Sequence, residues 1–105
     1  MANFVLLYSG GGMPETQAEI AQVMQAWGAW FGQLGSALVD GGNPFTPVAK
    51  RIAKDGSVSD APAGIASGYS IIKADSLDAA VALAKACPVL LGGAQITVLE
   101  TFPAM

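Results

Sequence analysis

Histidine is absent from this 105-residue sequence, which removes the side chain that most often binds metals and serves as a general base near neutral pH. The single cysteine, Cys87, excludes an internal disulfide and is typical of a protein in a reducing compartment. No serine can be activated by a neighbouring histidine, so a catalytic triad is excluded. We therefore expect neither a metal site nor a bound cofactor.

Charged residues are also scarce. They make up 12% of the chain, about half of the roughly 25% that is usual for a soluble domain. The net charge is −3, and the five Lys and Arg residues are scattered, which argues against a nucleic-acid partner. Charged side chains are too few to make up the usual share of a monomer's exposed surface. The composition therefore predicts that part of the surface is buried against a second copy of the chain.

Long hydrophobic runs are missing as well. No apolar run approaches the 18 or so residues that a transmembrane helix needs, so we expect no membrane partner. The N-terminal stretch ANFVLLYSGGG is short and lacks the basic residues of a signal peptide, so it predicts a strand. These features suggest a cytoplasmic protein whose residues 1–105 form one domain.

The hydrophobic pattern predicts two helices and an antiparallel sheet in the order β-α-β-hairpin-β-α-β. The expected strands are 3–9, 36–40, 65–74 and 95–101, with a hairpin within 48–60 and helices over 14–34 and 75–88. In the first strand, Phe4, Leu6 and Tyr8 would face one side of the sheet. Val5 and Leu7 would face the other, so both faces need cover. This order indicates an α+β, ferredoxin-like βαββαβ fold that pairs through its second sheet face as a dimeric α+β barrel.

The first predicted helix contains an unusual mixture of the largest and smallest side chains, WGAWFGQLG, over residues 27–35. Glycine costs a helix interior roughly 1 kcal/mol relative to alanine. Gly28 and Gly32 lie beside the aromatic residues, and Gly35 is the expected helix cap. Bare flanks of this kind predict either the close approach of another backbone or space for a ligand beside the rings. The apolar stripe comprises Ile20, Val23, Met24, Trp27, Trp30, Phe31 and Leu34.

Asp40 is the strongest candidate for chemistry. It stands at the predicted end of a strand, and the two glycines that follow it would let a ligand approach the backbone closely. In a partly desolvated cleft, its carboxylate could act as a general base. The alternative is that Asp40 starts a turn by accepting a hydrogen bond from its own backbone, as Asp-Gly sequences routinely do.

Four aromatic residues are further candidates. Trp27 and Trp30 lie three positions apart on one helix face, where they either pack in the core or wall a cavity and offer an indole N–H to a ligand. Tyr8 and Tyr69 lie on predicted strands, where their hydroxyls could donate to a carbonyl or carboxylate. The expected ligand pocket between the first helix and the sheet is lined by Tyr8, Trp27, Trp30, Asp40 and Tyr69.

The segments AWGAWFGQLGSALVDGG (26–42), SDAPAG (59–64), GYSIIKADSLDAA (68–80) and ITVLETFPAM (96–105) together resemble YCII-related proteins of the DGPF branch. The resemblance covers nearly the whole chain and implies homodimers of ferredoxin-like subunits. Activities in this family are mostly unassigned, and DGPF members are often encoded beside extracytoplasmic-function sigma factors, which implies regulation.

The chain departs from this family pattern at two places. Residues 60–63 read DAPA where the family has DGPF, and the histidine that pairs with an aspartate in classical members has no counterpart. Asp40 matches the family aspartate. We therefore expect a homodimer that binds a small organic molecule and does not turn it over. The alternatives are an isomerase or lyase with Asp40 as general base, and a solidly packed interaction protein.

Overall fold

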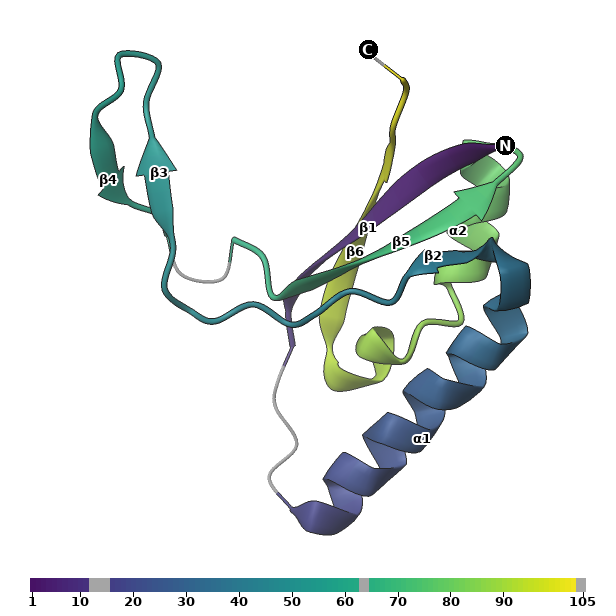
Figure 1. The fold of residues 1–105 in the computed structure, drawn as a ribbon. Coiled ribbons are helices and arrows are strands. Elements are labelled where there is room, and N and C mark those ends of the chain that lie inside the picture. Colours follow the sequence, from purple (N-terminus) through teal and green to yellow (C-terminus); the bar gives the residue numbers. More distant parts are fainter. Residues whose placement is uncertain (12–15, 63–64, 104–105) are drawn as a thin grey trace.

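The computed structural model describes residues 1–11, 16–62 and 65–103 (Figure 1). In these residues the chain forms a mixed α+β fold with two α-helices, a four-stranded antiparallel sheet and a separate two-stranded sheet. The larger sheet has the strand order β2-β5-β1-β6. Its strands are β1 (Ala2–Gly10), β2 (Leu38–Asp40), β5 (Gly68–Ala74) and β6 (Ala94–Glu100). The other elements are α1 (Gln17–Leu34), β3 (Lys50–Ile52), β4 (Val58–Asp60), α2 (Leu77–Ala84) and two 3-10 helices, η1 (Gly35–Ala37) and η2 (Pro88–Gly92).

The two faces of β1 differ as the sequence predicts. Phe4, Leu6 and Tyr8 are buried in the core against the helices. Val5 and Leu7 are only partly covered, because they point away from the helices. Residues directly opposite each other on antiparallel strands share a face. By this register, the face of the sheet turned away from the helices, called here the outer face, carries Val5, Leu7, Tyr69, Ile71, Thr97 and Leu99.

Helix α1 begins and ends with caps that its sequence encodes. The Oγ1 atom of Thr16 accepts a hydrogen bond from the backbone N–H of Glu19 at 3.1 Å, which caps the start of the helix. Gly35 follows the last helical residue with φ of +54°, and its N–H donates to the carbonyl of Phe31. The predicted first-turn positions 14 and 15 lie outside the described residues.

Only the second half of α1 packs against the sheet. Trp30 and Leu34 are buried, whereas the first-half residues Ile20, Val23 and Met24 are exposed, Met24 by 69%. The predicted apolar stripe is therefore covered only in its second half. The reason is geometric, since in Figure 1 the first turns of α1 extend past the ends of the strands.

The glycines of α1 open onto empty space. A Cβ atom built on Gly28 or Gly32 would have no described atom within 4 Å outside the surrounding helix. Neither a second backbone nor a cavity wall of the described chain therefore lies beside these two positions. The expected cap, Gly35, is the only one of the three whose positive φ requires glycine.

Helix α2 is short and lies on the sheet through small side chains. Ser76 caps it by accepting a hydrogen bond from the N–H of Ala79 at 3.1 Å. The helical spacing of the sequence predicts that Leu77, Ala80, Val81 and Ala84 face inward. Ala80 and Ala84 are indeed buried, whereas Leu77 is exposed, so the prediction is wrong for Leu77. The small alanine side chains let the backbone of α2 approach the sheet closely. The contact with the sheet therefore does not need the side chain of Leu77. None of the helices in the described ranges has the length and apolar character needed to cross a membrane.

Candidate functional site

The five sequence-predicted site residues fall into two groups on opposite faces of the sheet. Tyr8, Trp27 and Trp30 lie on the helix side, where the ring centroids of Tyr8 and Trp27 are 5.8 Å apart. Asp40 and Tyr69 lie together on the other side, with the Tyr69 hydroxyl 3.5 Å from Oδ2 of Asp40. The structure therefore brings the predicted residues together as a triplet and a pair.

The helix-side group is part of a tightly packed aromatic cluster. The rings of Trp27, Trp30 and Phe31 meet at centroid distances of 5.6–5.7 Å in edge-on or tilted orientations. Trp30 is only 2% exposed, and its Nε1–H donates to the carbonyl of Leu83 at 3.1 Å. This hydrogen bond occupies the indole group that a ligand would need, so the geometry favours a packing role for Trp30.

A network of three hydrogen bonds leads out of the core beside this cluster. The Cys87 thiol donates to the Tyr8 hydroxyl at 3.6 Å, and Tyr8 donates to Oγ of Ser70 at 2.7 Å. Ser70 in turn donates to the carbonyl of Gly41 at 2.8 Å. The network thus joins Cys87, the residue before η2, to β1, β5 and the loop after β2. The sequence pattern predicted no role for Ser70, although a serine inside an apolar strand is the signal that could have identified it.

Burial sets the ionisation of the two titratable groups in this hydrogen-bonded network, Tyr8 and Cys87. Desolvation raises the pKa of Tyr8 far above its ordinary value, against a smaller opposing effect of the hydrogen bond to Ser70. Desolvation likewise raises the pKa of the Cys87 thiol. The folded protein therefore holds both protons at a pH where the unfolded chain has already released them.

We expect the protein to lose stability in alkali for this reason. The contribution of both groups is complete below their unfolded pKa values, about 8.5 for Cys and 10 for Tyr, and is lost as the pH rises through the folded values. The free energy of unfolding should fall by about 1–2 kcal/mol between pH 8 and pH 11 because of Tyr8 alone. Urea denaturation of Tyr8→Phe across this range should give a flatter profile than the wild type. Tyr69→Phe is the control, and parallel profiles for Tyr8→Phe and wild type would contradict the assignment.

Asp40 and Tyr69, called here the outer-face pair, lie where the end of β2 runs beside β5. The register shifts between Leu38, which faces Ile72, and Asp40, which faces Ile71. Without this bulge, Asp40 would point to the same face as the core residue Leu38, because side chains alternate along a strand. The bulge therefore places the carboxylate on the outer face beside Tyr69.

The carboxylate of Asp40 is partly engaged by its own loop. Its Oδ1 accepts the N–H of Gly42 at 2.8 Å, which is the turn geometry expected of an Asp-Gly sequence. Its Oδ2 has a long contact to Tyr69, whose ring stacks on Phe45 at a centroid distance of 5.6 Å. In the part of the chain that the structure describes, Lys50 pairs with Asp60, and no Lys or Arg side chain forms an ion pair with Asp40. The pair thus offers a proton acceptor and a hydroxyl donor at an accessible, aromatic-rich margin.

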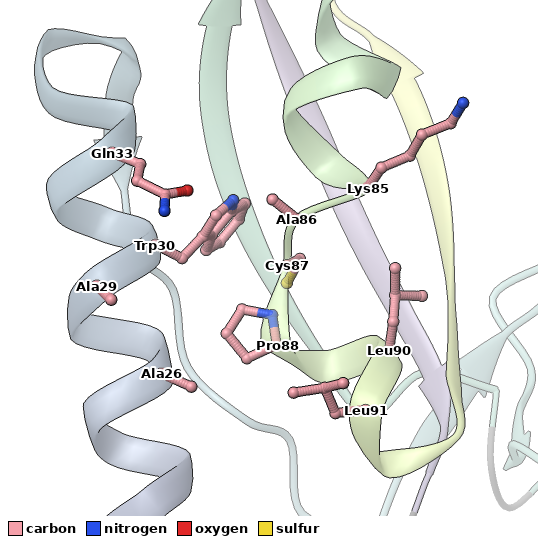
Figure 2. Close-up of a pocket in the computed structure, with 10 residues that line it drawn as sticks. All are labelled: Ala26, Ala29, Trp30, Gln33, Lys85, Ala86, Cys87, Pro88, Leu90 and Leu91. Carbon is pink, nitrogen blue, oxygen red and sulfur yellow. The ribbon is translucent and has the colours of Figure 1, made fainter.

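A shallow groove lies between α1 and the segment 85–91, with a cavity volume of about 300 Å³ (Figure 2). Figure 2 shows the amide of Gln33 beside the Trp30 ring, whereas the Lys85 side chain extends away from α1. The rest of the lining is mostly alanine, proline and leucine. Few polar groups converge here, so the groove does not resemble a catalytic site. The described residues also contain no group of three or more acidic or cysteine side chains that could hold a metal ion.

No protein-family model, curated protein or solved structure matches this chain. The resemblance to YCII-related proteins therefore stays a prediction that rests on the sequence segments quoted above.

Proposed function

We propose that this chain is a YCII-related homodimer that binds a small organic molecule between two sheets packed through their outer faces. The strand order β2-β5-β1-β6, with both helices on one face, supports a ferredoxin-like arrangement into which the β3–β4 hairpin is inserted. Two such sheets packed face to face form a dimeric α+β barrel.

The apolar outer face carries this proposal. Val5, Ile71 and Leu99 lie side by side across three strands, and none of them is fully buried. The chain exposes 7321 Å², whereas a folded monomer of its mass would expose about 5,500 Å². The excess is larger than the roughly 800 Å² that each partner buries in a standard protein interface. A second copy on the outer face would remove much of this apolar surface from water.

The ligand is best placed beside Asp40 and Tyr69. The aromatic cluster fills the space between α1 and the sheet, which disfavours the pocket expected there from the sequence. The outer-face pair instead combines a carboxylate, a hydroxyl and the stacked ring of Phe45 next to apolar surface. Such a site suits a small molecule with an apolar body and one hydrogen-bonding group. We propose a sensing or carrier role for it.

Light scattering after size-exclusion chromatography tests the dimer. We expect the wild type to be a dimer and Ile71→Lys to be a monomer, because a charge at the centre of the outer face cannot be buried there without a partner. Gln22→Lys places the same charge on the exposed part of α1 and should remain dimeric. A monomeric wild type would overturn the proposal.

Native mass spectrometry tests the binding. The dimer should carry additional mass that is absent under denaturing conditions, and Tyr69→Phe and Asp40→Asn should reduce the occupied fraction. A dimer without any added mass would leave the assembly standing and remove the binding role.

A proton-transfer enzyme is the second candidate, favoured by the 3.5 Å distance between the Tyr69 hydroxyl and Oδ2 of Asp40. Asp40 would take a proton from carbon next to a carbonyl, Tyr69 would donate a hydrogen bond to the resulting enolate oxygen, and Asp40 would return the proton to yield an isomer. Deuterium uptake from D₂O into small oxo acids should then depend on Asp40 and be lost in Asp40→Asn.

A further inference from the structure

The β3–β4 hairpin stands clear of the rest of the chain. In Figure 1 it projects away from the helices, beyond the start of β5. Its two strands pair with each other and form their own sheet, separate from the four-stranded one. Every residue from 50 to 60 is exposed. The hairpin is therefore an arm that the described part of the chain does not cover.

The arm has a well-defined construction. The strand pairs are Lys50 with Asp60, Arg51 with Ser59 and Ile52 with Val58, and the first pair forms an ion pair. In the turn, the Asp55 carboxylate accepts both the N–H and the hydroxyl of Ser57, at 2.9 and 2.7 Å. Gly56 supplies the positive φ of +89° that the turn requires. The sequence thus specifies this hairpin, although an isolated two-stranded hairpin is only marginally stable in water.

One face of the arm is built for contact. Ile52 and Val58 lie directly opposite each other, and they are 72% and 63% exposed. Val48, just before the arm, is also exposed. By the alternation of side chains along each strand, the Lys50–Asp60 ion pair shares the face of Ile52 and Val58, whereas Arg51 and Ser59 occupy the opposite face, which is wholly polar. A surface packed onto Ile52 and Val58 would remove their apolar area from water, which would stabilise the contact.

The dimensions of the protein indicate which surface would pack onto Ile52 and Val58. Its radius of gyration is 15.2 Å, whereas a compact domain of 105 residues has a value of about 13 Å. Its principal extents are 44 × 39 × 17 Å, so it is a thin plate with a projection. Such a shape is typical of a protomer that becomes compact only with a second copy. A two-fold axis would also give both arms equivalent contacts.

We propose that the β3–β4 hairpin is an exchange arm that packs Ile52 and Val58 onto the second copy of this chain. The inference rests on the proposed dimer and adds a separate contact at the rim of the sheet-to-sheet interface. The chain reaches the arm from Asp40 through Phe45, which stacks on Tyr69. The segment that leads into the arm therefore passes the proposed ligand site.

Sedimentation equilibrium of arm variants tests this contact. The N–H of Ala61 already donates to the carbonyl of Ala49 at 3.1 Å, so Asn-Gly in place of residues 50–60 should close the neck as a two-residue turn. We expect this deletion, and the double variant Ile52→Ser/Val58→Ser, to raise the dimer dissociation constant at least about tenfold, or about 1.4 kcal/mol. The matched double variant Arg51→Ala/Ser59→Ala, on the polar face, should change it less than about twofold.

Fluorescent labelling provides a second measurement that does not depend on weakening the dimer. Cys87 is buried, so a cysteine introduced on the arm can be labelled selectively with bimane. The label at Val58→Cys should shift its emission to the blue when the protein dimerises, whereas the label at Arg51→Cys should not.

The outcomes separate the arm from the dimer. An unchanged dissociation constant after deletion of residues 50–60, or no shift at position 58, overturns the arm and leaves the sheet-face dimer in place. A dimer that survives Ile71→Lys but is lost with the arm supports the arm and overturns the sheet-face interface. A wild-type chain that is monomeric at all concentrations overturns both.

Discussion

Replacing Trp30 with alanine should lower the free energy of unfolding by about 3–5 kcal/mol, which is the range for removing a large aromatic side chain from a core. Trp30 is almost fully buried, and its ring contacts those of Trp27 and Phe31. Its indole N–H also ties α1 to the end of α2 through the carbonyl of Leu83. The substitution therefore removes buried area and the hydrogen bond that joins the two helices.

Two neighbouring substitutions calibrate this result. Trp30→Phe keeps an aromatic ring but removes the N–H donor. The lost hydrogen bond should contribute about 1 kcal/mol to the decrease in the free energy of unfolding. Trp27→Ala should cost less than Trp30→Ala, because Trp27 is only partly buried. Urea denaturation followed by circular dichroism gives all three values without relying on tryptophan fluorescence. Equal losses for the two tryptophans, or a loss below about 1 kcal/mol for Trp30→Ala, would contradict the packing described for the cluster.

The features that the sequence predicts correctly are those governed by local chemistry. The alternation of β1 follows from its apolar pattern. Thr16 and Ser76 cap the helix starts through side-chain oxygens, and Gly35 ends α1 through its positive φ and its backbone N–H. The turn at Asp55 is equally local. Each depends on residues within a few positions of one another, so the sequence carries the complete signal.

The candidate site depends instead on register, which no local pattern specifies. Tyr8 and Tyr69 look alike in the sequence, since each lies in an apolar strand. Tyr8 pairs with Gly68 and Tyr69 pairs with Leu7, so the two rings fall on opposite faces of the sheet. The bulge before Asp40 then moves the carboxylate away from the core face. A pocket containing both tyrosines could therefore be expected from the sequence, whereas their separation follows only from strand pairing.

The overhang of α1 has a similar cause. Its stripe continues through Ile20 and Val23 because the helix pattern is regular, but the strands end before that part of the helix. The pattern predicts an apolar face without specifying which element covers it.

Gly42→Ala is expected to be as damaging as the loss of Trp30, although it adds only a methyl group. Gly42 has φ of +77°, and a Cβ atom there would overlap the carbonyl oxygen of Tyr69 and lie 2.6 Å from its carbonyl carbon. These are backbone atoms in β5, so the strain cannot be relieved by a side-chain rotation. The combined cost of the positive φ and the overlap should be about 3–5 kcal/mol. The glycine that the sequence assigns to ligand approach thus makes room for the chain's own sheet.

Gly28→Ala is the matched control, since the same methyl group is added where no described atom lies within 4 Å outside the helix. It should raise the free energy of unfolding by about 1 kcal/mol because alanine favours a helix over glycine. Thermal denaturation should therefore give shifts of opposite sign for the two variants. A neutral Gly42→Ala would mean that the loop after Asp40 does not pack on β5. A destabilising Gly28→Ala would mean that another chain covers this face of α1, which is one of the two explanations that its glycines allow.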